Sequence, residues 1–325
     1  PVVYSSTVQI PLGGTDDVSA ESTLQYLYRL DGAAERVVLT GQTLTLTHLT
    51  NGVHTLAVRA VDEASNEDAT PVAVSFTVRN VLSIVTGLRG RSSTEVRTFD
   101  YLGKRKSRFI AFPTYRTGVS VTTLDGDANG SGEIAAAPGR GGPPEVRIFT
   151  PAGKLIRKFS VYPNGFRGGV NLATLDINGD GRDEIVVAPA SGRGPFIRIF
   201  SATGTLLGEA AAFPSSFNGG VNIAAGQLSS TGAPTILAAP ATGGSAQIAQ
   251  MEWRSGKLVV AKRLGLGYGK QKVAIRPALG NVNGTGNAEI ILRVETAKAG
   301  SDVLVLNANG RLLKKFNGTP GSGTD

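Results

Sequence analysis

A segment of about fifty residues is repeated along most of this chain, and the repeat limits the folds that the chain can adopt. Three copies begin with the related stretches EVRTF, EVRIF and FIRIF, and a fourth, more diverged copy begins with IAQMEW. One aromatic position recurs at a spacing of about 51 residues, as Tyr115, Phe166, Phe217 and Tyr268. Repeats of this length form stacked units, each of which buries an apolar face against its neighbour.

Each copy contains four short segments with the length of β-strands. In the clearest copy they read GVNLATLD, EIVVAPA, FIRIFS and TLLGEAAAF. Four-stranded units in tandem predict the blades of a β-propeller, and a linear β-solenoid is the alternative. We therefore expect an all-β propeller of about five four-stranded blades over residues 81–318, then a flexible Gly/Ser/Thr tail over 319–325. Glycine marks the turn before the fourth segment, at Gly103, Gly153, Gly204, Gly256 and Gly310.

The first of these blades lacks one strand in the sequence. Segments of the second, third and fourth type occur five times, but the first type occurs four times, before the loops at Asp125, Asp176, Gln227 and Asn281. We therefore expect the innermost strand of the first blade to be missing, which leaves backbone donors and acceptors to be paired. Three sources of that strand stay open here: residues beyond Asp325, the segment Val72–Val78, or another copy of the chain.

Residues 1–80 differ from the repeats in charge and in pattern. They contain four Arg, no Lys and nine acidic residues, a net charge of −5, whereas the whole chain carries +8 and the remainder therefore +13. Apolar residues alternate over short segments, as in β-strands. The pair Asn51-Gly52 lies between two such segments and predicts a tight hairpin. We expect a separate β-sandwich over residues 1–80.

Composition narrows the available chemistry. The chain has no Cys and only two His, His48 and His54, both in residues 1–80. Disulfides and Cys nucleophiles are therefore excluded, and the repeats cannot hold a Ser-His-Asp triad. We expect both His to lie on the surface or to pack between strands. No apolar run reaches the length of a membrane helix and no signal peptide opens the chain, which begins with Pro1, so we expect an excerpt or a processed form.

An acidic loop follows the first strand of each repeat, and its clearest copy reads DINGDGRDE. Alternate oxygens of a tight loop with glycines can converge on one hard cation, which takes about six to eight oxygen ligands. A plain turn without metal is the alternative. The candidate ligands in the clearest copy are Asp176, Asn178, Asp180, the Arg182 carbonyl and Glu184. In the copy before it they are Asp125, Asp127, Asn129, the Ser131 carbonyl and Glu133.

The other two copies of the loop carry fewer carboxylates. A single carboxylate neutralises only part of the charge of Ca²⁺, so we expect weak binding in the fourth copy. The third copy has no carboxylate at its ligand positions, and we expect a turn held by side-chain hydrogen bonds. The fourth copy offers Asn281, Asn283, Thr285, Asn287 and Glu289, and the third offers Gln227, Ser229, Thr231 and Thr235.

The pattern D-x-[DN]-x-D-G-x-x-[DE], followed by an apolar strand, resembles the FG-GAP and VCBS repeats, which build the integrin α-subunit head and many bacterial surface propellers. The resemblance covers roughly residues 81–317. It implies structural Ca²⁺ at one or two sites, bound by the two sets of ligands named above. Within residues 1–80, the stretch YRLDG and the following LTLTHLTNGVHTLAVRAVDEASN resemble bacterial immunoglobulin-like or fibronectin type III-like modules, which serve as spacers or adhesive units.

Basic residues gather on the fourth strand of several repeats. A solvated rim on the outermost strand is one interpretation, and contact with an acidic glycan or surface polymer is the other. Aromatic residues are not interleaved with the charges, which argues against single-stranded nucleic acid. The residues are Lys104, Arg105, Lys106, Arg108, Arg157, Lys158, Lys314 and Lys315.

Together these features predict a non-enzymatic, extracellular protein of a bacterial cell surface. We expect a role in adhesion or as a structural, filament-forming component with calcium-stabilised loops. Its expected partners are other surface proteins, copies of itself through strand exchange or head-to-tail assembly, and acidic glycans; we expect no nucleic acid and no membrane span. The alternative is a lectin-like, glycan-binding module of a secreted protein, which would need aromatic pockets between blades, with the repeated aromatic position as the candidate.

Overall fold

The structure, a computed structural model, shows an all-β protein, which confirms the predicted fold class at this level. It describes residues 2–3, 8–13, 24–34, 36–38, 43–46, 49, 52–78, 84–88, 90, 93–100, 102–128, 132–228, 233–283, 287–296 and 300–318. Within these ranges the chain forms 27 strands. None of the described residues belongs to a helix with the length and hydropathy needed to cross a membrane. The chain divides into two compact units, one built on Pro1–Leu82 and one on Ser83–Asp127 and Gly132–Asp325.

The first unit has a five-stranded sheet, ordered β1-β7-β6-β3-β4, and a two-stranded sheet, β2-β5. Both sheets contribute to one apolar core, because alternate residues of β5 and of β6 and β7 point into it. The core side chains are Leu44, Leu46, Leu49, Leu56, Phe76 and Val78. The strands are Val2–Val3 (β1), Val8–Pro11 (β2), Gln25–Leu30 (β3), Arg36–Val38 (β4), Thr43–Leu46 (β5), Gly52–Val61 (β6) and Val72–Val78 (β7).

The hairpin predicted at Asn51-Gly52 is wrong. The segment before this pair, β5, pairs with β2, and the segment after it, β6, pairs with β3 and β7. The two predicted arms therefore lie in different sheets, although Asn51 itself is outside the described residues. Period-2 alternation does not distinguish these arrangements, because two strands that face each other across a core alternate like two strands of one hairpin.

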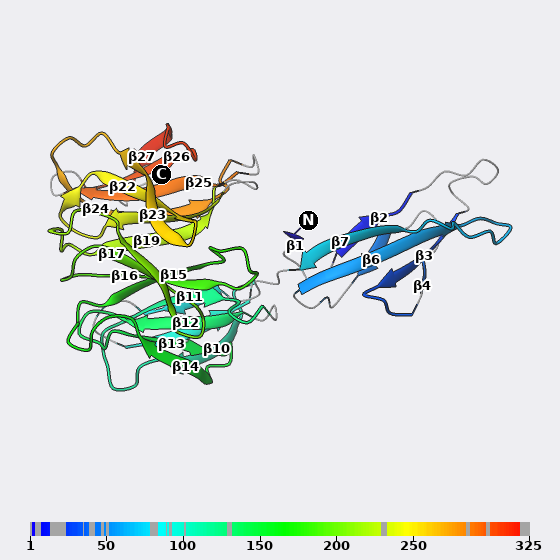
Figure 1. The fold of residues 1–325 in the computed structure, drawn as a ribbon, viewed down its shortest axis with the longest axis horizontal. Coiled ribbons are helices and arrows are strands. Elements are labelled where there is room, and N and C mark those ends of the chain that lie inside the picture. Colours follow the sequence, from blue (N-terminus) through cyan, green and yellow to red (C-terminus); the bar gives the residue numbers. More distant parts are fainter. Residues whose placement is uncertain are drawn as a thin grey trace, which may run out of the picture. The chain divides into compact units, whose positions relative to one another are not determined.

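The second unit contains five antiparallel sheets, one for each repeat, which we number sheets 1 to 5 in chain order. Their strand orders are β10-β9-β8, β11-β12-β13-β14, β15-β16-β17-β18, β19-β20-β22-β23 and β21-β24-β25-β26-β27. Figure 1 shows the sheets following one another along the unit, from cyan through green and yellow to red.

The strand bounds of the second unit match the predicted segments closely. Sheet 1 contains Ile84–Gly87 (β8), Glu95–Phe99 (β9) and Arg105–Ile110 (β10). Sheet 2 contains Val119–Leu124 (β11), Glu133–Pro138 (β12), Glu145–Phe149 (β13) and Leu155–Ser160 (β14). Sheet 3 contains Val170–Leu175 (β15), Glu184–Pro189 (β16), Phe196–Phe200 (β17) and Leu206–Ala211 (β18). Sheet 4 contains Val221–Gln227 (β19), Pro234–Pro240 (β20), Gln247–Arg254 (β22) and Lys257–Gly265 (β23). Sheet 5 contains Gly244–Ser245 (β21), Lys272–Gly280 (β24), Glu289–Thr296 (β25), Ser301–Leu306 (β26) and Leu312–Asn317 (β27).

Sheet 1 has three strands, as the repeat count predicts. They correspond to the second, third and fourth segments of a repeat, and among the described residues no strand pairs with the other edge of β8. The segment Val72–Val78 does not fill this position, because it forms β7 and pairs with β6 and β1 in the first unit.

The second strand of each complete repeat contributes to two cores at once. In β16 all six residues are buried. Ile185 and Val187 belong to the cluster shared with sheet 2, whereas Val186 and Ala188 belong to the cluster shared with sheet 4. This explains why the second segments read as continuous apolar runs, since strand alternation sends successive side chains to opposite faces and both faces are covered.

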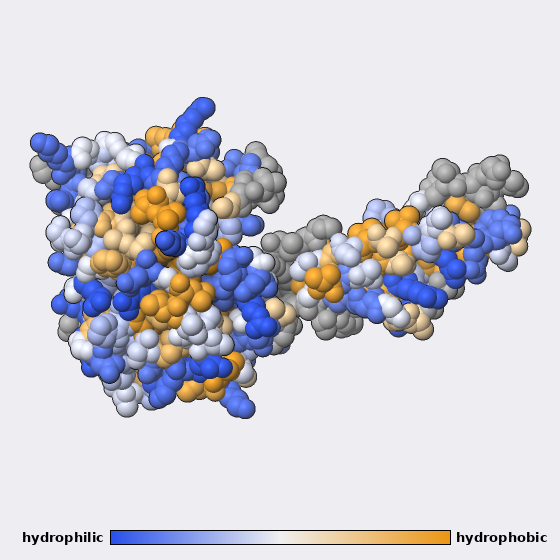
Figure 2. Space-filling model, viewed as in Figure 1, coloured by the Kyte–Doolittle hydropathy of each residue, from blue (hydrophilic) through white to orange (hydrophobic). Residues whose placement is uncertain are grey.

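The surface of the second unit mixes apolar and charged side chains. Figure 2 shows small apolar areas interrupted by hydrophilic ones on the face in view. Apolar pairs are exposed at the start of three outer strands, Leu155-Ile156, Leu206-Leu207 and Leu312-Leu313. The basic residues predicted on the outermost strand do lie at that edge, on β10, β14 and β27, or in the turn just before β10.

Candidate metal-binding loops

The four acidic loops join the first strand of a sheet to the second, and they lie where the sequence places them. They follow β11, β15, β19 and β24, and the antiparallel pairing of each strand pair ends at the loop. In the first two loops the register runs to the pairs Leu124↔Glu133 and Leu175↔Glu184. The final Glu of each loop is therefore held by the sheet, while the residues before it form the turn.

The loop after β11 brings three carboxylates together. Asp125, Asp127 and Glu133 each offer an oxygen, and these oxygens all lie within 4.8 Å of one another. Burial raises the pKa of Glu133; the Gly126 amide offsets part of this rise, and the charges of Asp127 and Asp125 add to it. The other two predicted ligands, Asn129 and Ser131, lie outside the described residues. This cluster supplies hard oxygen donors that repel one another without a cation.

The loop after β15 has three carboxylates at its candidate ligand positions, in a different arrangement. Both oxygens of Asp176 accept backbone N–H groups, from Gly179 at 2.7 Å and from Gly181 at 2.9 Å. The two glycines have φ of 81° and 83°, a left-handed conformation that side chains disfavour. Asp180 accepts from the amide of Arg182 at 2.9 Å and from the side chain of Asn178 at 3.1 Å. The Asp176 and Asp180 carboxylates therefore cap backbone N–H groups of the turn, and this loop does not form a three-carboxylate cluster.

Glu184, the last residue of this loop, has a raised pKa. It is only 3% exposed, and burial raises its pKa to about 7. The Ile177 N–H donates to its Oε2 at 3.0 Å and lowers the pKa in part. The charges of Asp180, Asp176 and Asp183 raise it further. A cation in this loop would favour the charged carboxylate, because it would reverse the sign of the local field.

The final Glu also has a structural role that sequence reasoning missed. In three loops its Oε2 accepts the N–H of the residue after the first loop position. The bonds run from Gly126 to Glu133 at 3.1 Å, from Ile177 to Glu184 at 3.0 Å, and from Val282 to Glu289 at 3.0 Å. The recurrence of Glu seven residues after that amide in three copies was the signal that could have predicted this bond.

The remaining two loops carry fewer carboxylates and are held by side-chain hydrogen bonds. In the fourth copy, Asn283 donates to Glu289 at 2.7 Å; Asn281 and Asn287 bring no further carboxylate, and Thr285 is outside the described residues. In the third copy, Thr235 replaces the Glu and bonds the Ala233 carbonyl at 3.1 Å. Gln227 ends β19, and Ser229 and Thr231 are not described.

Neighbouring loops are also joined to each other. The Asp125 N–H donates to Asp183 Oδ2 at 2.8 Å, and the Asp183 N–H donates to the Asp125 carbonyl at 2.9 Å. Asp183 belongs to the loop of the next repeat, so this pair connects the three-carboxylate cluster to sheet 3. The conformation of the loop that begins at Asp125 therefore depends on the position of the loop that contains Asp183.

The repeated aromatic position has mostly a packing role. Tyr115 packs against the core shared by sheets 1 and 2. Phe166 and Phe217 lie edge-on to Tyr162 and Phe213, at 5.1 and 5.5 Å between ring centroids. Tyr268 packs against the core shared by sheets 4 and 5 and also lines a cleft of about 450 Å³ between them.

The cleft at Tyr268 combines an aromatic ring with polar groups. The Tyr268 hydroxyl donates to Asp302 at 2.5 Å, and Lys315 lies 2.9 Å from the same carboxylate and 5.1 Å from the ring centroid. Gln271 and Thr296 also line the cleft. This is the kind of aromatic pocket between neighbouring sheets that the lectin-like alternative required.

His54 packs between strands, as expected, but it has a partner that sequence reasoning did not find. It is 6% exposed, and its Nδ1 lies 2.6 Å from Asp31, which is 23 residues away in a turn. Burial raises the pKa of Asp31, but the hydrogen bonds from His54 and Thr55 outweigh it, so the net shift is downward. His48 lies outside the described residues.

No family model matches the chain, and no curated protein sequence matches it. Solved structures do match. The rhamnogalacturonan lyase YesW is 13% identical, with a TM-score of 0.42 over 94% of this chain and 65% of that protein. A rhamnogalacturonan lyase of Bacillus licheniformis is 14% identical, with a TM-score of 0.41 over 97% of this chain and 68% of that protein. A quinonprotein alcohol dehydrogenase-like protein of Bacteroides thetaiotaomicron is 10% identical, with a TM-score of 0.24 over 97% of this chain and 92% of that protein.

These matches correct the predicted function. They contradict the prediction of a non-enzymatic protein in adhesion or filament formation, because YesW and the Bacillus licheniformis protein are lyases. The sequence argument excluded catalysis because the repeats lack His and Cys, but carboxylates, Lys and Tyr also serve as general acids and bases. At this identity and TM-score the matches assign no activity and no substrate to this chain, which spans 65% of YesW.

Proposed function

We propose that this chain is a calcium-binding repeat protein whose metal ions stiffen the junctions between repeats. In the finer fold that we propose, sheets 1 to 5 are the blades of a propeller left open between sheet 5 and sheet 1, and the first unit is an immunoglobulin-like sandwich. The observation that carries the proposal is the cluster of Asp125, Asp127 and Glu133, with oxygens within 4.8 Å of one another.

The donor set suits Ca²⁺ better than other common ions. All candidate ligands are oxygens, from carboxylates, amides and carbonyls, and Ca²⁺ accepts six to eight such ligands in a flexible geometry, roughly 2.3–2.6 Å away. Mg²⁺ demands a nearly ideal octahedron and retains its waters, so a loop of this kind should select against it. Asp125, Asp127 and Glu133 would hold the first ion, together with Asn129 and the Ser131 carbonyl.

A second ion at Asp176–Glu184 requires the loop to change. Asp176 and Asp180 would exchange backbone partners for metal, and Glu184 would lose its proton. This exchange costs hydrogen bonds, so we propose that the loop after β11 binds more tightly than the loop after β15. Because Asp183 joins the two loops, binding in the first should favour binding in the second.

The test is calcium titration of the full chain, followed by calorimetry and thermal unfolding. A ligand that binds only the folded state stabilises it, by about 2.7 kcal/mol at a free concentration 100 times its Kd. We expect Ca²⁺ to raise Tm relative to EDTA, Mg²⁺ to do so less, and Asp127→Asn to remove most of the effect. Glu63→Gln, which removes an exposed carboxylate from the first unit, is the matched control. An unchanged Tm between EDTA and millimolar Ca²⁺ would contradict the proposal.

A second candidate function is glycan binding at the Tyr268 cleft. It is favoured by one observation, the combination of an aromatic ring, an amide, a hydroxyl and a charged pair in one cleft of about 450 Å³. Such polar groups beside a ring fit a sugar with hydroxyl and carboxylate substituents. Lys315→Ala and Lys314→Ala make a matched pair, because alternation places these neighbours on opposite faces of β27. We expect only Lys315→Ala to weaken binding of acidic oligosaccharides in a glycan array; equal losses would contradict the site.

We propose an extracellular location together with the calcium sites. Extracellular calcium modules bind with a Kd of roughly 10⁻⁴–10⁻³ M, and we expect a Kd in this range for these loops. A Kd in the nanomolar range would argue against this location, because it would let the sites fill inside cells.

A further inference from the structure

Neighbouring repeats are joined by a recurring arginine contact. Arg147 of sheet 2 donates to the Ala111 carbonyl at 2.9 Å and lies 4.5 Å from the ring centroid of Phe112, both at the end of sheet 1. In sheet 3, Arg198 donates to the Val161 carbonyl at 2.9 Å and lies 5.2 Å from the Tyr162 ring. We call the side of a sheet that faces the preceding repeat its leading face and the other side its trailing face. At both junctions the arginine thus extends from the leading face of one sheet to the end of the outermost strand of the preceding sheet.

The junction between sheets 4 and 3 uses the same contact from a different strand. There Arg263, on β23, donates to the Ala212 carbonyl at 2.6 Å and lies 6.0 Å from the Phe213 ring. The three acceptor residues share one backbone arrangement. The N–H groups of Ala111, Val161 and Ala212 bond the carbonyls of Thr94, Pro144 and Pro195, respectively.

An aromatic contact accompanies the arginine. Phe109 on the trailing face of sheet 1 lies 4.9 Å from Phe149 of sheet 2, between ring centroids. A Cβ at Gly153 would lie 2.6 Å from the Phe109 ring, so glycine is required for this approach. The next junction repeats the arrangement with Phe159 and Phe200, 5.5 Å apart.

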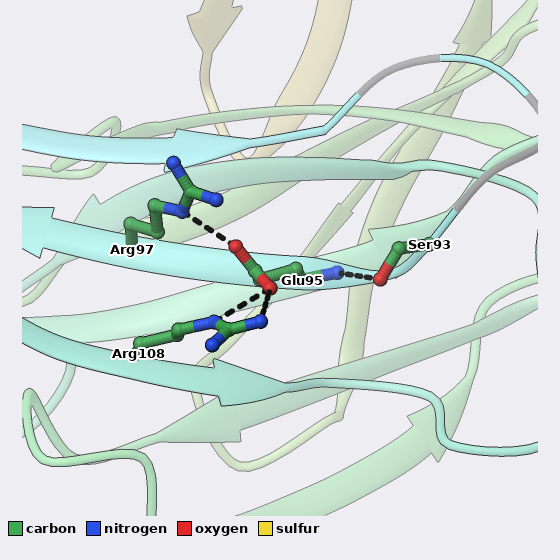
Figure 3. Close-up of polar contacts among 4 residues, drawn as sticks. All are labelled: Ser93, Glu95, Arg97 and Arg108. Atoms are coloured by element: carbon green, nitrogen blue, oxygen red, sulfur yellow. Dashed lines mark hydrogen bonds and ion pairs between the residues drawn. The ribbon is translucent and has the colours of Figure 1, made fainter.

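The leading face of sheet 1 has the same groups without a preceding repeat. Arg97 takes the place of Arg147 in the EVR stretch, and Phe99 that of Phe149. Figure 3 shows Glu95 between Arg97 of its own strand and Arg108 of β10, with bonds of 2.5 and 2.7 Å. The Arg97 side chain is 42% exposed, whereas the side chain of Arg147 is 21% exposed.

Two further features of this leading face are open. A Cβ at Gly103, the counterpart of Gly153, would meet nothing within 4 Å. Ile84, opposite Phe99 in the register of β8 and β9, is 52% exposed. The face therefore presents an apolar and cationic surface that the later repeats bury.

The trailing face of sheet 5 presents the complementary groups. Phe316 occupies the position of Phe159, since LLKKFN aligns with LIRKFS, and it is 49% exposed. The Gly318 N–H bonds the Ser301 carbonyl at 2.7 Å, as Ala111, Val161 and Ala212 bond theirs. Gly318 thus places its carbonyl where the other junctions accept an arginine. Among the described residues no core cluster joins sheet 5 to sheet 1.

We propose that a second copy of this chain docks head to tail, with the trailing face of sheet 5 in one copy against the leading face of sheet 1 in the other. The occupant is a second copy because one chain carries, on these two faces, the arginine, the acceptor carbonyl and the packing phenylalanines of a contact that it already uses between its own sheets. The ring under the arginine has no counterpart, since Thr319 follows Gly318. In this contact Arg97 donates to the Gly318 carbonyl of the other copy, and Phe316 packs on Phe99 and Gly103. The contact surfaces differ from the calcium loops and from the Tyr268 cleft.

Sedimentation of the full chain over a range of concentrations tests this contact. We expect concentration-dependent association, weakened at least about tenfold by Phe316→Asp, because burial of a phenylalanine side chain is lost. Leu313→Asp is the matched control, because this residue is similarly exposed, at 44%, and alternation places it on the opposite face of β27. Ile84→Asp disrupts the other half of the contact and should weaken association similarly.

A mixing experiment identifies the head-to-tail geometry. Ile84→Asp protein keeps an intact trailing face, and Phe316→Asp protein keeps an intact leading face, so a mixture should form dimers and nothing larger. Each variant alone should remain monomeric at the same concentration. A wild-type chain that stays monomeric, equal effects of Phe316→Asp and Leu313→Asp, or a mixture that does not form dimers would each overturn the proposal. Circular dichroism of every variant verifies that the fold is retained.

Discussion

Removal of the negative charge from the buried end of the loop after β15 should stabilise the calcium-free protein at neutral pH. Glu184 is 3% exposed and shares its loop with three aspartates. The substitution Glu184→Gln keeps an oxygen that can accept the Ile177 N–H, now 3.0 Å from Oε2, and removes the charge that burial and the aspartates oppose. The expected effect depends on pH in a defined direction.

The magnitude follows from the pKa of Glu184, which rises from 4.5 to about 7 on folding. Each tenfold change in proton affinity corresponds to about 1.4 kcal/mol, so the upper limit is about 3 kcal/mol. Below pH 4.5 Glu184 is protonated in both the folded and the unfolded state, so it does not lower the free energy of unfolding. Between pH 4.5 and 7 the folded state keeps a proton that the unfolded state has released, so the free energy of unfolding falls as pH rises. Above pH 7 the loss is complete.

Urea unfolding in EDTA at pH 5 and pH 8 measures this effect. We expect the wild-type free energy of unfolding to fall by about 1–3 kcal/mol between these pH values and the fall to shrink in Glu184→Gln. Glu289→Gln is the matched control, because Glu289 is also 3% exposed and accepts the equivalent N–H, but its loop carries Asn281, Thr285 and Ala288 where the other carries its three aspartates. The reasoning is refuted if Glu184→Gln and the wild type lose equal stability between pH 5 and pH 8.

Two further predictions concern the junctions between repeats. Arg147→Ala should lower the free energy of unfolding by about 2 kcal/mol, because it removes a charged hydrogen bond to Ala111 and a cation–π contact. Arg157→Ala, at an exposed position, should change it by less than about 0.5 kcal/mol. Equal urea midpoints for the two variants would contradict this prediction. Gly220→Ala should cost at least about 2 kcal/mol, because φ is 80° and a Cβ would lie 2.0 Å from the Ala190 carbonyl oxygen. Gly165→Ala, with open space at its Cβ, is the control, and a similar loss of Tm in both variants would show that the close approach is not required.

The repeat made the strands of the second unit predictable. Four copies of one pattern show which positions are apolar in every unit, and the glycine turns mark where each strand ends. The three strands of sheet 1 follow from the same comparison. In the first unit there is one copy, so the alternation around Asn51-Gly52 had no second instance to show that its arms lie in different sheets.

The geometry of the acidic loops was less predictable. The loop Asp176–Glu184 matches the motif best, yet the carboxylates cluster in the loop of Asp125. One cause is the placement of the middle carboxylate, at Asp127 in one loop and at Asp180 in the other. A shift of two residues along a tight turn decides whether an acid caps a backbone N–H or points toward its neighbours, and ligand spacing alone does not show this. The partner of His54, Asp31, was equally hidden by its distance in sequence.

The double burial of the second strands determines how the second unit should come apart. Because Val186 and Val187 of β16 serve different neighbours, an internal sheet cannot open without exposing the apolar faces of two others. Opening of sheet 1 or sheet 5 exposes the apolar face of only one neighbouring sheet, so unfolding should begin at these two sheets and proceed toward sheet 3. Amide hydrogen exchange should accordingly be slowest in β16 and faster toward β9 and β26, a gradient that a single cooperative core would not show.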